Sequence, residues 1–115
     1  MRLRSDIWVA AYLRRCGVEG ANAVLRRRGA AEAGAIFVKV DHLNGRATLY
    51  GPAPQSVAAE LAPGVERIFA RAHEPDSIGS DEAEEKLRRE ISFDPDLWIV
   101  EVESGPPGAW LDLAP

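Results

Sequence analysis

Hydrophobic and polar residues alternate most regularly between residues 36 and 50. Two runs rich in β-branched and aromatic side chains flank Asn44-Gly45, the dipeptide preferred in two-residue type I′ turns because both of its positions need a positive φ. This pattern predicts a β-hairpin in which Val40 faces Leu49. In that register one face is apolar and the other is mixed, as expected for an antiparallel sheet covered on one side. The mixed face carries Lys39, Asp41, Thr48 and Tyr50.

A helical period precedes the hairpin, over residues 6–16. Apolar side chains recur there at spacings of three and four, and the early turns are apolar almost all round, which is typical of a buried helix. Ser5 stands where an N-terminal cap would lie, and Gly17 stands where the helix would end. The periodic positions are Val9, Tyr12, Leu13 and Cys16.

A second helix and a last strand are predicted in the C-terminal half. Asp81 and Glu84 form a pair that resembles a capping box. Ala83 and Leu87 give this helix only a narrow apolar stripe, so we expect it on the surface with a solvated, charged outer face. Residues 97–103 then alternate in the manner of a strand with one acidic edge.

Three further segments complete the expected order of elements. Residues 22–28 alternate as a first strand. Residues 56–64 are compatible with either a short helix or a surface connection. Residues 65–73 match both helical and strand spacing, and their short length between Gly64 and Pro75 favours a strand.

The strands are grouped together rather than alternating with helices, which predicts an α+β fold. We expect an antiparallel sheet of four to five strands, an N-terminal buried helix, and a second surface helix before the last strand. Residues 1–104 form the expected single α+β domain. Residues 105–115 form a Pro/Gly linker and an apolar C-terminal tail, which either anchors on the domain or binds a partner.

Composition narrows the class of protein. Of the 115 residues, 46% are hydrophobic and 28% are charged, which is ordinary for a globular protein. No apolar run reaches the length of a membrane span, and no secretory hydrophobic region follows the first residues. We therefore expect a cytoplasmic protein with no membrane partner. The single cysteine, Cys16, excludes an internal disulfide and a multi-cysteine metal site.

The net charge of −4 is unevenly distributed. Residues 1–50 contain nine basic and four acidic residues, a net charge of +5, whereas residues 51–115 contain five basic and fourteen acidic residues, a net charge of −9. This asymmetry suits either an anionic partner or attraction between two halves of one domain, and the acidic total favours the second interpretation. Strand alternation also splits Arg26, Arg27 and Arg28 between two faces, so we do not expect specific binding to nucleic acid.

Distinctive short stretches are spread over nearly the whole chain. They include Arg27-Arg28-Gly29, Ala33-Gly34-Ala35, residues 49–55 and residues 93–98. In aggregate they resemble an uncharacterised family of short alphaproteobacterial proteins, known only as a domain of unknown function. The resemblance implies a bacterial protein and no particular activity. Where that family often carries an acidic residue after the glycine of the first stretch, this chain has Ala30.

One polar cluster is the candidate site for an anionic ligand or a partner. Its arginines could line one side of the sheet, and arginine forks match carboxylates and phosphates. The alternative, which we favour, is a solvated sheet face on which the cations pair with Glu101 and Glu103. The cluster consists of Arg27, Arg28, Lys39, Tyr50 and Gln55.

The sequence contains no recognisable catalytic or metal-binding pattern. Cys16 lies on the predicted apolar stripe and is expected to be a buried packing residue. His42 is expected at the rim of the core and His73 on the surface, and no spacing matches a metal site. No phosphate-binding glycine loop is present. We therefore expect no cofactor, no metal and no catalytic residues.

These observations favour a small non-enzymatic binding or interaction domain, which would act as a homo-oligomer or hold a protein partner. Two alternatives stay open: a nucleic-acid-binding module that uses the basic N-terminal half, and a small enzyme that acts on an anionic metabolite. The first hypothesis predicts salt-tolerant oligomers, and the second predicts an affinity that falls steeply with salt. The third predicts that one metabolite stabilises the fold by mass action.

Overall fold

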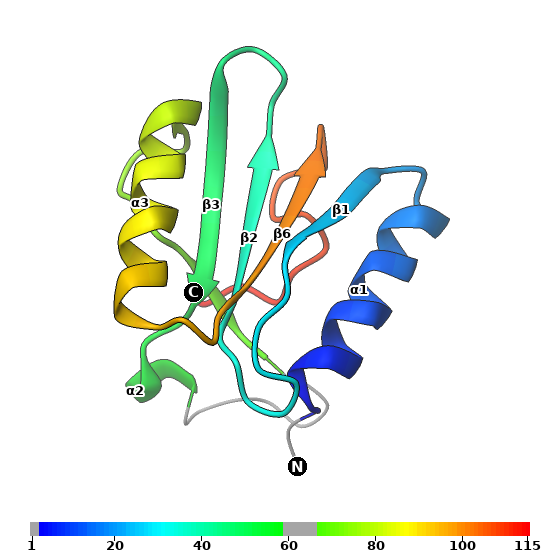
Figure 1. Ribbon diagram of the computed structural model, residues 1–115. Coiled ribbons are helices and arrows are strands. Elements are labelled where there is room, and N and C mark those ends of the chain that lie inside the picture. The colour runs from blue at the N-terminus through cyan, green and yellow to red at the C-terminus, as the bar shows by residue number, and fades with distance from the viewer. Residues whose placement is uncertain (1–2, 59–66) are drawn as a thin grey trace.

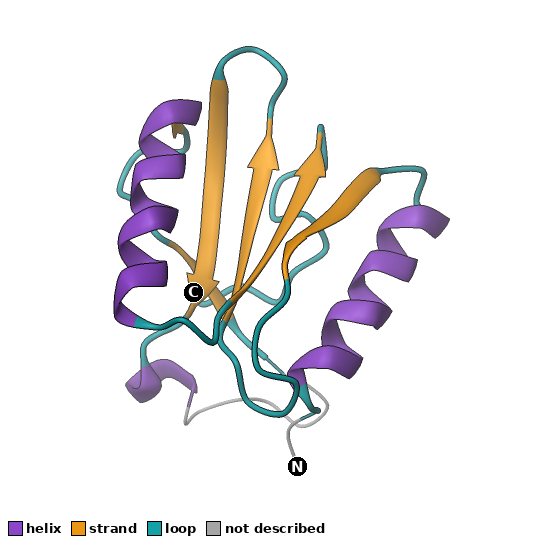
Figure 2. Cartoon of the chain, in the orientation of Figure 1, coloured by secondary structure: helices purple, strands orange, loops and turns teal. Residues whose placement is uncertain are grey.

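A mostly antiparallel sheet with one long helix on each side forms the computed structural model of this protein (Figure 1, Figure 2). The structure describes residues 3–58 and 67–115. The grouping of the strands confirms the α+β class. In chain order the elements are α1 (Ser5–Val18), β1 (Asn22–Arg27), β2 (Ile36–Asp41), β3 (Arg46–Pro52), α2 (Gln55–Ala58), β4 (Phe69–Arg71), β5 (Ile78–Gly79), α3 (Ser80–Phe93) and β6 (Trp98–Glu103).

The six strands form one sheet in the order β1-β6-β2-β3-β4, with the short β5 paired to β3. Four of the pairings are antiparallel, and the pairing of β2 with β6 is parallel. We predicted an antiparallel sheet of four to five strands. The observed sheet has in addition the two-residue strand β5, and one of its pairs is parallel. A parallel pair needs a crossover between its strands, and α3 lies on the connection that brings the chain back to β6.

Both faces of the sheet are covered, which corrects the expectation that only one is (Figure 1). On one face Val38 packs in a cluster with Tyr12 of α1 and with part of the C-terminal tail. On the other face Phe37 packs in a cluster with Leu87 of α3. Because successive residues of a strand point to opposite faces, a strand covered on both sides is buried along its length and mostly apolar. The first five residues of β2 are accordingly all buried.

The hairpin register differs by one residue from the predicted one. Val40 pairs with Thr48 rather than with Leu49, because the loop contains three residues instead of two. The amide of His42 donates to the carbonyl of Arg46 at 3.0 Å and closes that loop. As a consequence, every side chain of β3 points to the face opposite to the predicted one.

Side chains of the loop explain why the type I′ turn does not form. The Asn44 Oδ1 atom accepts a hydrogen bond from the amide of Arg46 at 3.0 Å, and Asp41 Oδ1 accepts one from the amide of Leu43 at 2.8 Å. Leu43 and Gly45 take positive φ values of 62° and 83°. Leucine rarely adopts this conformation, and the two side-chain hydrogen bonds offset its cost.

The two long helices occupy the predicted positions, but neither begins as predicted. Ser5 lies inside α1, and its hydroxyl donates to the carbonyl of Gly34 at 2.6 Å instead of capping the helix. Asp81 and Glu84 form no capping box, because Glu84 faces the sheet and binds two cations. The buried faces agree with the periodicity: Val9, Tyr12 and Cys16 in α1, and Ala83 and Leu87 in α3.

The C-terminal tail docks on the sheet, which is the first of the two alternatives considered for it. Ala109 is fully buried, and its carbonyl accepts a hydrogen bond from the Tyr12 hydroxyl at 2.9 Å. The tail then reaches the outer edge of β4. There the Phe69 amide donates to the Asp112 carbonyl, and the Phe69 carbonyl accepts from the Ala114 amide, both at 2.8 Å.

The two ambiguous segments are described only in part. β4 confirms a strand within residues 65–73, although residues 65 and 66 lie outside the described residues. Of residues 56–64, the described part belongs to the short helix α2, and residues 59–64 lie outside. In the described ranges, no helix is long and apolar enough to cross a membrane.

Candidate functional site

The five residues predicted to form one binding cluster lie in separate places. Lys39 points toward α3 and is 4% exposed, whereas Tyr50 belongs to the core cluster on the opposite face and is 8% exposed. Gln55 is exposed at the start of α2. The predicted register placed Lys39 and Tyr50 on one face, and the one-residue shift separates them.

Arg27 and Arg28 hold the chain that leads into β6. The Arg27 Nη1 atom donates to the carbonyl oxygens of Pro95 at 2.9 Å and Leu97 at 3.1 Å. The guanidinium of Arg28 lies 5.3 Å from the centroid of the Trp98 ring, in a cation–π arrangement. Both arginines therefore have structural partners within the chain.

Gly29 and Gly34 lie in the loop between β1 and β2. They let this loop approach the segment that leads into β6 closely. A Cβ atom added to Gly29 or Gly34 would overlap the backbone carbonyl of Asp96. That carbonyl accepts a hydrogen bond from the Ala30 amide, and the Ala30 carbonyl accepts one from Trp98 Nε1, both at 2.8 Å. Stretches that carry the family resemblance thus interlock, which gives them a structural explanation.

A cluster of charges lies between the sheet and α3. Lys39 Nζ donates to Glu84 Oε2 at 2.7 Å and lies 3.9 Å from Glu101 Oε1. Arg26 donates to both carboxylate oxygens of Glu84 at 2.8 Å and to Glu101 at 3.0 Å. The hydrogen bonds from Arg26 and from Lys39 lower the pKa of Glu84 to about 2. Of the expected pairs with Glu101 and Glu103, only that of Lys39 with Glu101 is seen among the described residues, and Lys39 is buried under α3 instead of lying on a solvated face. The sequence analysis missed Glu84.

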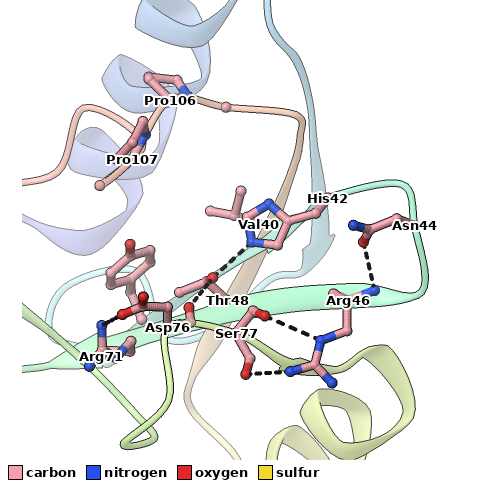
Figure 3. A pocket seen from close by; sticks show the side chains of 13 residues that line it. Val40, His42, Asn44, Arg46, Thr48, Arg71, Asp76, Ser77, Pro106 and Pro107 are labelled. Carbon is pink, nitrogen blue, oxygen red and sulfur yellow. Dashed lines mark hydrogen bonds and ion pairs between the residues drawn. The ribbon is translucent and has the colours of Figure 1, made fainter.

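A pocket of about 630 Å³ lies beside the hairpin, on the face opposite α3 (Figure 3). Val40, Thr48 and Tyr50 line its buried floor, and Pro106 and Pro107 of the tail lie on the other side. We call it the hairpin pocket. The polar and charged residues of its rim are His42, Asn44, Arg46, Arg71, Asp76 and Ser77.

Two arginines fix the loop 73–77 that borders the hairpin pocket. Arg46 donates from Nε to the Ser77 hydroxyl at 3.2 Å and from Nη2 to the Ser77 carbonyl at 2.7 Å. Arg71 donates to two carbonyls of the loop and to the Asp76 carboxylate at 3.1 Å. Both guanidinium groups are therefore held in place, and Arg46 Nη1 has no partner among the described residues.

The hydrogen bonds around His42 select one tautomer of its ring. The Thr48 hydroxyl donates its only proton to the Asp76 carbonyl at 2.8 Å. The 2.8 Å contact between His42 Nε2 and Thr48 Oγ1 therefore has Nε2 as the donor. The other ring nitrogen, Nδ1, lies on the side away from Thr48 (Figure 3). It forms no hydrogen bond with the described part of the chain and can accept one from a ligand.

Thr48 is not arranged as an activated nucleophile. A hydroxyl nucleophile needs its proton directed at a base. The Thr48 proton is instead directed at a backbone carbonyl, and His42 donates to Thr48 rather than accepting from it. His42 lies at the rim of the core, as predicted, with part of its ring exposed.

The second histidine has a structural role, which corrects the expectation that His73 is exposed. Its Nε2 atom accepts a hydrogen bond from the amide of Leu49 at 3.0 Å. Its Nδ1 atom lies 2.7 Å from the Pro75 carbonyl and donates to it. Both ring nitrogens are therefore occupied, and partial burial lowers the pKa of His73.

Among the residues that the structure describes, neither the cysteine nor any cluster of acidic side chains suggests a metal centre. Cys16 is fully buried, as predicted, and burial raises the pKa of its thiol. Across residues 3–58 and 67–115, no three His, Cys, Asp or Glu side chains are grouped so that they could hold a metal ion.

The fold and the pocket define a small α+β protein with a long helix on each face of its sheet and a polar pocket beside its hairpin. The chain belongs to the DUF1491 family of proteins of unknown function, whose model matches residues 3–111. This agrees with the family resemblance noted in the sequence.

Three solved structures are similar to this chain. The solution structure of protein Atu0922 from A. tumefaciens is 41% identical, with a TM-score of 0.79, and the match covers 98% of this chain and 95% of that one. A crystal structure of a DUF1491 family protein from Caulobacter crescentus is 32% identical, with a TM-score of 0.77, over the whole of both chains. An NMR structure of a DUF1491 protein from the same species is 31% identical, with a TM-score of 0.74, over 100% and 99% of the two chains. No curated protein matched.

Proposed function

We propose that this protein is a small cytoplasmic binding domain that holds a carboxylate- or phosphate-bearing ligand in the hairpin pocket. The observation that supports the proposal best is the placement of Arg46, Arg71 and His42 on the rim of one pocket. Guanidinium groups that are held in place match these anions better than free side chains, because less conformational freedom is lost on binding.

The charges at the pocket favour an anion although the protein is acidic overall. Asp76 offsets Arg71, since the two form an ion pair at 3.1 Å. Arg46 bonds only the uncharged groups of Ser77, so its positive charge is not neutralised there. The oxyanion of the ligand would take donors from Arg46 Nη1, and a hydroxyl or protonated oxygen of the same ligand would donate to His42 Nδ1, above the floor formed by Tyr50 and Val40.

A binding role is favoured over the two alternatives. The enzyme hypothesis would use the same pocket, but the Thr48 hydroxyl is not directed at a base. The nucleic-acid hypothesis depends on Arg26, Arg27 and Arg28, each of which already has a partner within the chain. Single-strand binders also combine basic grooves with stacking aromatic residues, and no aromatic residue is interleaved with these three arginines in the sequence.

The cytoplasmic location is part of the proposal. The one thiol, at Cys16, is free and buried, which suits a compartment in which cysteines stay reduced. The ligand would be either a small metabolite or an acidic side chain of a protein partner. Both kinds of ligand would present an oxyanion to the guanidinium group of Arg46.

Isothermal titration and thermal melting test this proposal, with inorganic phosphate, succinate, citrate and a short poly-glutamate peptide as probes. We expect at least one probe to raise the melting temperature, because a ligand that binds only the folded state stabilises it. Arg46→Ala is expected to weaken that binding about tenfold or more, in line with the loss of one charged hydrogen bond. The matched control is Arg89→Ala, which removes an exposed charge from the outer side of α3.

The variant Arg46→Lys separates charge from geometry. It keeps the positive charge and loses the planar fork, so an affinity between those of Arg46→Ala and the original protein is expected. The proposal fails if none of the four probes binds, or if Arg89→Ala weakens binding as much as Arg46→Ala. Turnover of a bound probe would instead promote the enzyme hypothesis.

A further inference from the structure

A second pocket, of about 500 Å³, lies on the face of the sheet that α3 covers. It is found where the C-terminal end of α3 faces β4 and the end of β3, so the sheet separates it from the hairpin pocket. We call it the α3 pocket. Its volume lies within the range of pockets that hold small molecules, about 300–1,000 Å³. Its chemistry differs from that of the hairpin pocket, because its charged groups are mainly acidic.

The wall that the sheet contributes to the α3 pocket is apolar. Phe37 belongs to the core cluster beneath α3. Ala70 and Ala72 point to the same face, whereas Phe69 points to the opposite core. The Phe37 ring lies against Gly51, where an added Cβ would come within 2.6 Å of the ring atom Cε2. These small residues leave room beside the Phe37 ring for the apolar body of a ligand.

Two carboxylates lie at the α3 end of the pocket. Glu90 and Asp94 are four residues apart, and both are half-buried. The Asp94 Oδ1 atom accepts a hydrogen bond from the Asp96 amide at 3.0 Å, which leaves Oδ2 available. Within the described part of the chain, neither carboxylate forms an ion pair. Arg71 also borders the pocket, but it forms its ion pair with Asp76 at 3.1 Å and bonds carbonyls of the loop 73–77.

The end of α3 adds to the negative potential of these two carboxylates. Carbonyl groups at the C-terminal end of a helix carry a partial negative charge, which basic side chains in the last turn commonly offset. The last turn of α3 has no basic residue. It contains Glu90 instead, and Asp94 follows at the C-cap. Like charges therefore gather at this end of the pocket, and a bound cation would relieve their repulsion.

We propose that the α3 pocket binds a small organic amine, with its ammonium group between Glu90 and Asp94 and its apolar body against Phe37. An ammonium group has only donors, and the two carboxylates offer only acceptors. The apolar wall favours a cation that carries an apolar group over a hydrated metal ion. Among the described residues, moreover, no three side chains are grouped so that they could hold a metal. The inference does not depend on the hairpin pocket.

Isothermal titration with three probes of similar size and different charge tests the proposal. The probes are phenethylamine, the neutral phenethyl alcohol and the anionic hydrocinnamate. We expect the amine to bind at least about tenfold more tightly than the other two, because it alone pairs with the carboxylates. Methylamine has the charge without the apolar body, so it is expected to bind more weakly than phenethylamine.

Substitutions of the two carboxylates locate the ammonium group. Glu90→Gln and Asp94→Asn keep the shape of each side chain and remove its charge, so each is expected to weaken phenethylamine binding about tenfold. Glu82→Gln is the matched control, because it removes an exposed carboxylate from the first turn of the same helix. Its affinity for phenethylamine is expected to equal that of the original protein.

A larger side chain in the wall tests the position of the apolar body. Ala70→Leu fills the pocket without changing its charge and is expected to abolish phenethylamine binding. Should this variant melt earlier than the original protein, Ala72→Leu at an exposed position replaces it. The proposal is overturned if phenethylamine does not bind, or if phenethyl alcohol binds as tightly. It is also overturned if Glu82→Gln weakens binding as much as Glu90→Gln, or if the leucine variants bind the amine unchanged.

Discussion

The imidazole of His73 takes the place of a strand partner for Leu49, whose amide donates to Nε2 at 3.0 Å. In β3, Leu49 lies between Tyr50, which pairs with β4, and Ala47, which pairs with β5. The side chain therefore bridges the gap between two short strands. An imidazole nitrogen accepts a hydrogen bond only while it is unprotonated, so this bridge requires the neutral ring of His73.

Stability is expected to fall with acidification because of His73. Burial lowers its pKa in the folded state, so the unfolded state binds the proton more readily. The resulting stability is fully present above the unfolded pKa of about 6.5 and is lost as the pH falls through the folded pKa. Urea melts between about pH 7 and pH 5 measure this loss. The loss is expected to shrink in His73→Gln and to persist in His42→Gln; an unchanged slope in His73→Gln contradicts the assignment.

The free energy of unfolding is expected to fall again in a second, lower pH range, because of Glu84. Its pKa is lowered from 4.5 to about 2 by Arg26 and Lys39. Stability from this carboxylate is present above about pH 4.5 and is lost as the pH falls toward 2, and it amounts to about 3 kcal/mol at most. Glu84→Gln removes this dependence in urea melts and also leaves Lys39 without its nearest acceptor. Glu82→Gln, on the exposed side of α3, serves as control and is expected to leave the acid range unchanged.

Gly29→Ala is expected to destabilise the protein by about 2–4 kcal/mol, because its Cβ would overlap backbone atoms of Asp96 and Leu97 that no side-chain movement can clear. Gly17→Ala is the control. Nothing lies within 4 Å of its added Cβ, and it stands inside α1, so alanine is expected to stabilise the helix by about 0.5–1 kcal/mol. Urea unfolding measures both changes, and equal effects of the two substitutions contradict the interlock.

The thiol of Cys16 is expected to react slowly with an aromatic disulfide reagent at neutral pH. It is fully buried, and burial raises its pKa, while the thiolate is the reactive form. Phe93→Cys, combined with Cys16→Ala, supplies an exposed thiol as the fast-reacting control. Rapid labelling of Cys16 in the folded protein would show that α1 opens more readily than its packing indicates.

Local periodicity predicted the elements that bury a single face. α1 and α3 each turn one side to the sheet, so their apolar positions recur at helical spacing and both helices were found from sequence. The buried state of Cys16 followed from the same pattern. The role of Ser5 could not be predicted from this pattern. Its hydroxyl donates to the carbonyl of Gly34, and this contact joins residues 29 positions apart in the sequence.

The hairpin register could not be obtained in the same way. β2 is covered on both faces, so shifting its partner by one residue still places apolar side chains on each side. The choice between a two-residue and a three-residue loop then depends on side-chain hydrogen bonds of Asp41 and Asn44. The sequence pattern does not reveal the length of the hairpin loop. For this reason the predicted register placed Lys39 and Tyr50 on one face and in one site.

The hairpin pocket was beyond sequence analysis for a different reason. Its residues come from the hairpin, from the loop around Asp76 and from the tail at Pro106. Only Tyr50 belonged to the predicted cluster, and His42 was placed at the rim of the core without a partner. An arginine near a hairpin is common, and nothing local indicates that Arg46 and Arg71 border one cavity.

The placement of β6 has a consequence for how the chain reaches this structure. β6 is the last strand in sequence, yet it lies between β1 and β2. A nascent chain that has emerged only as far as α3 holds β1 and β2 without the strand that joins them, so the sheet cannot close progressively from one end. Pairings of such long sequence separation slow folding. We expect a late, cooperative folding step in which residues 98–103 insert, and until then exposed strand edges that chaperones can recognise.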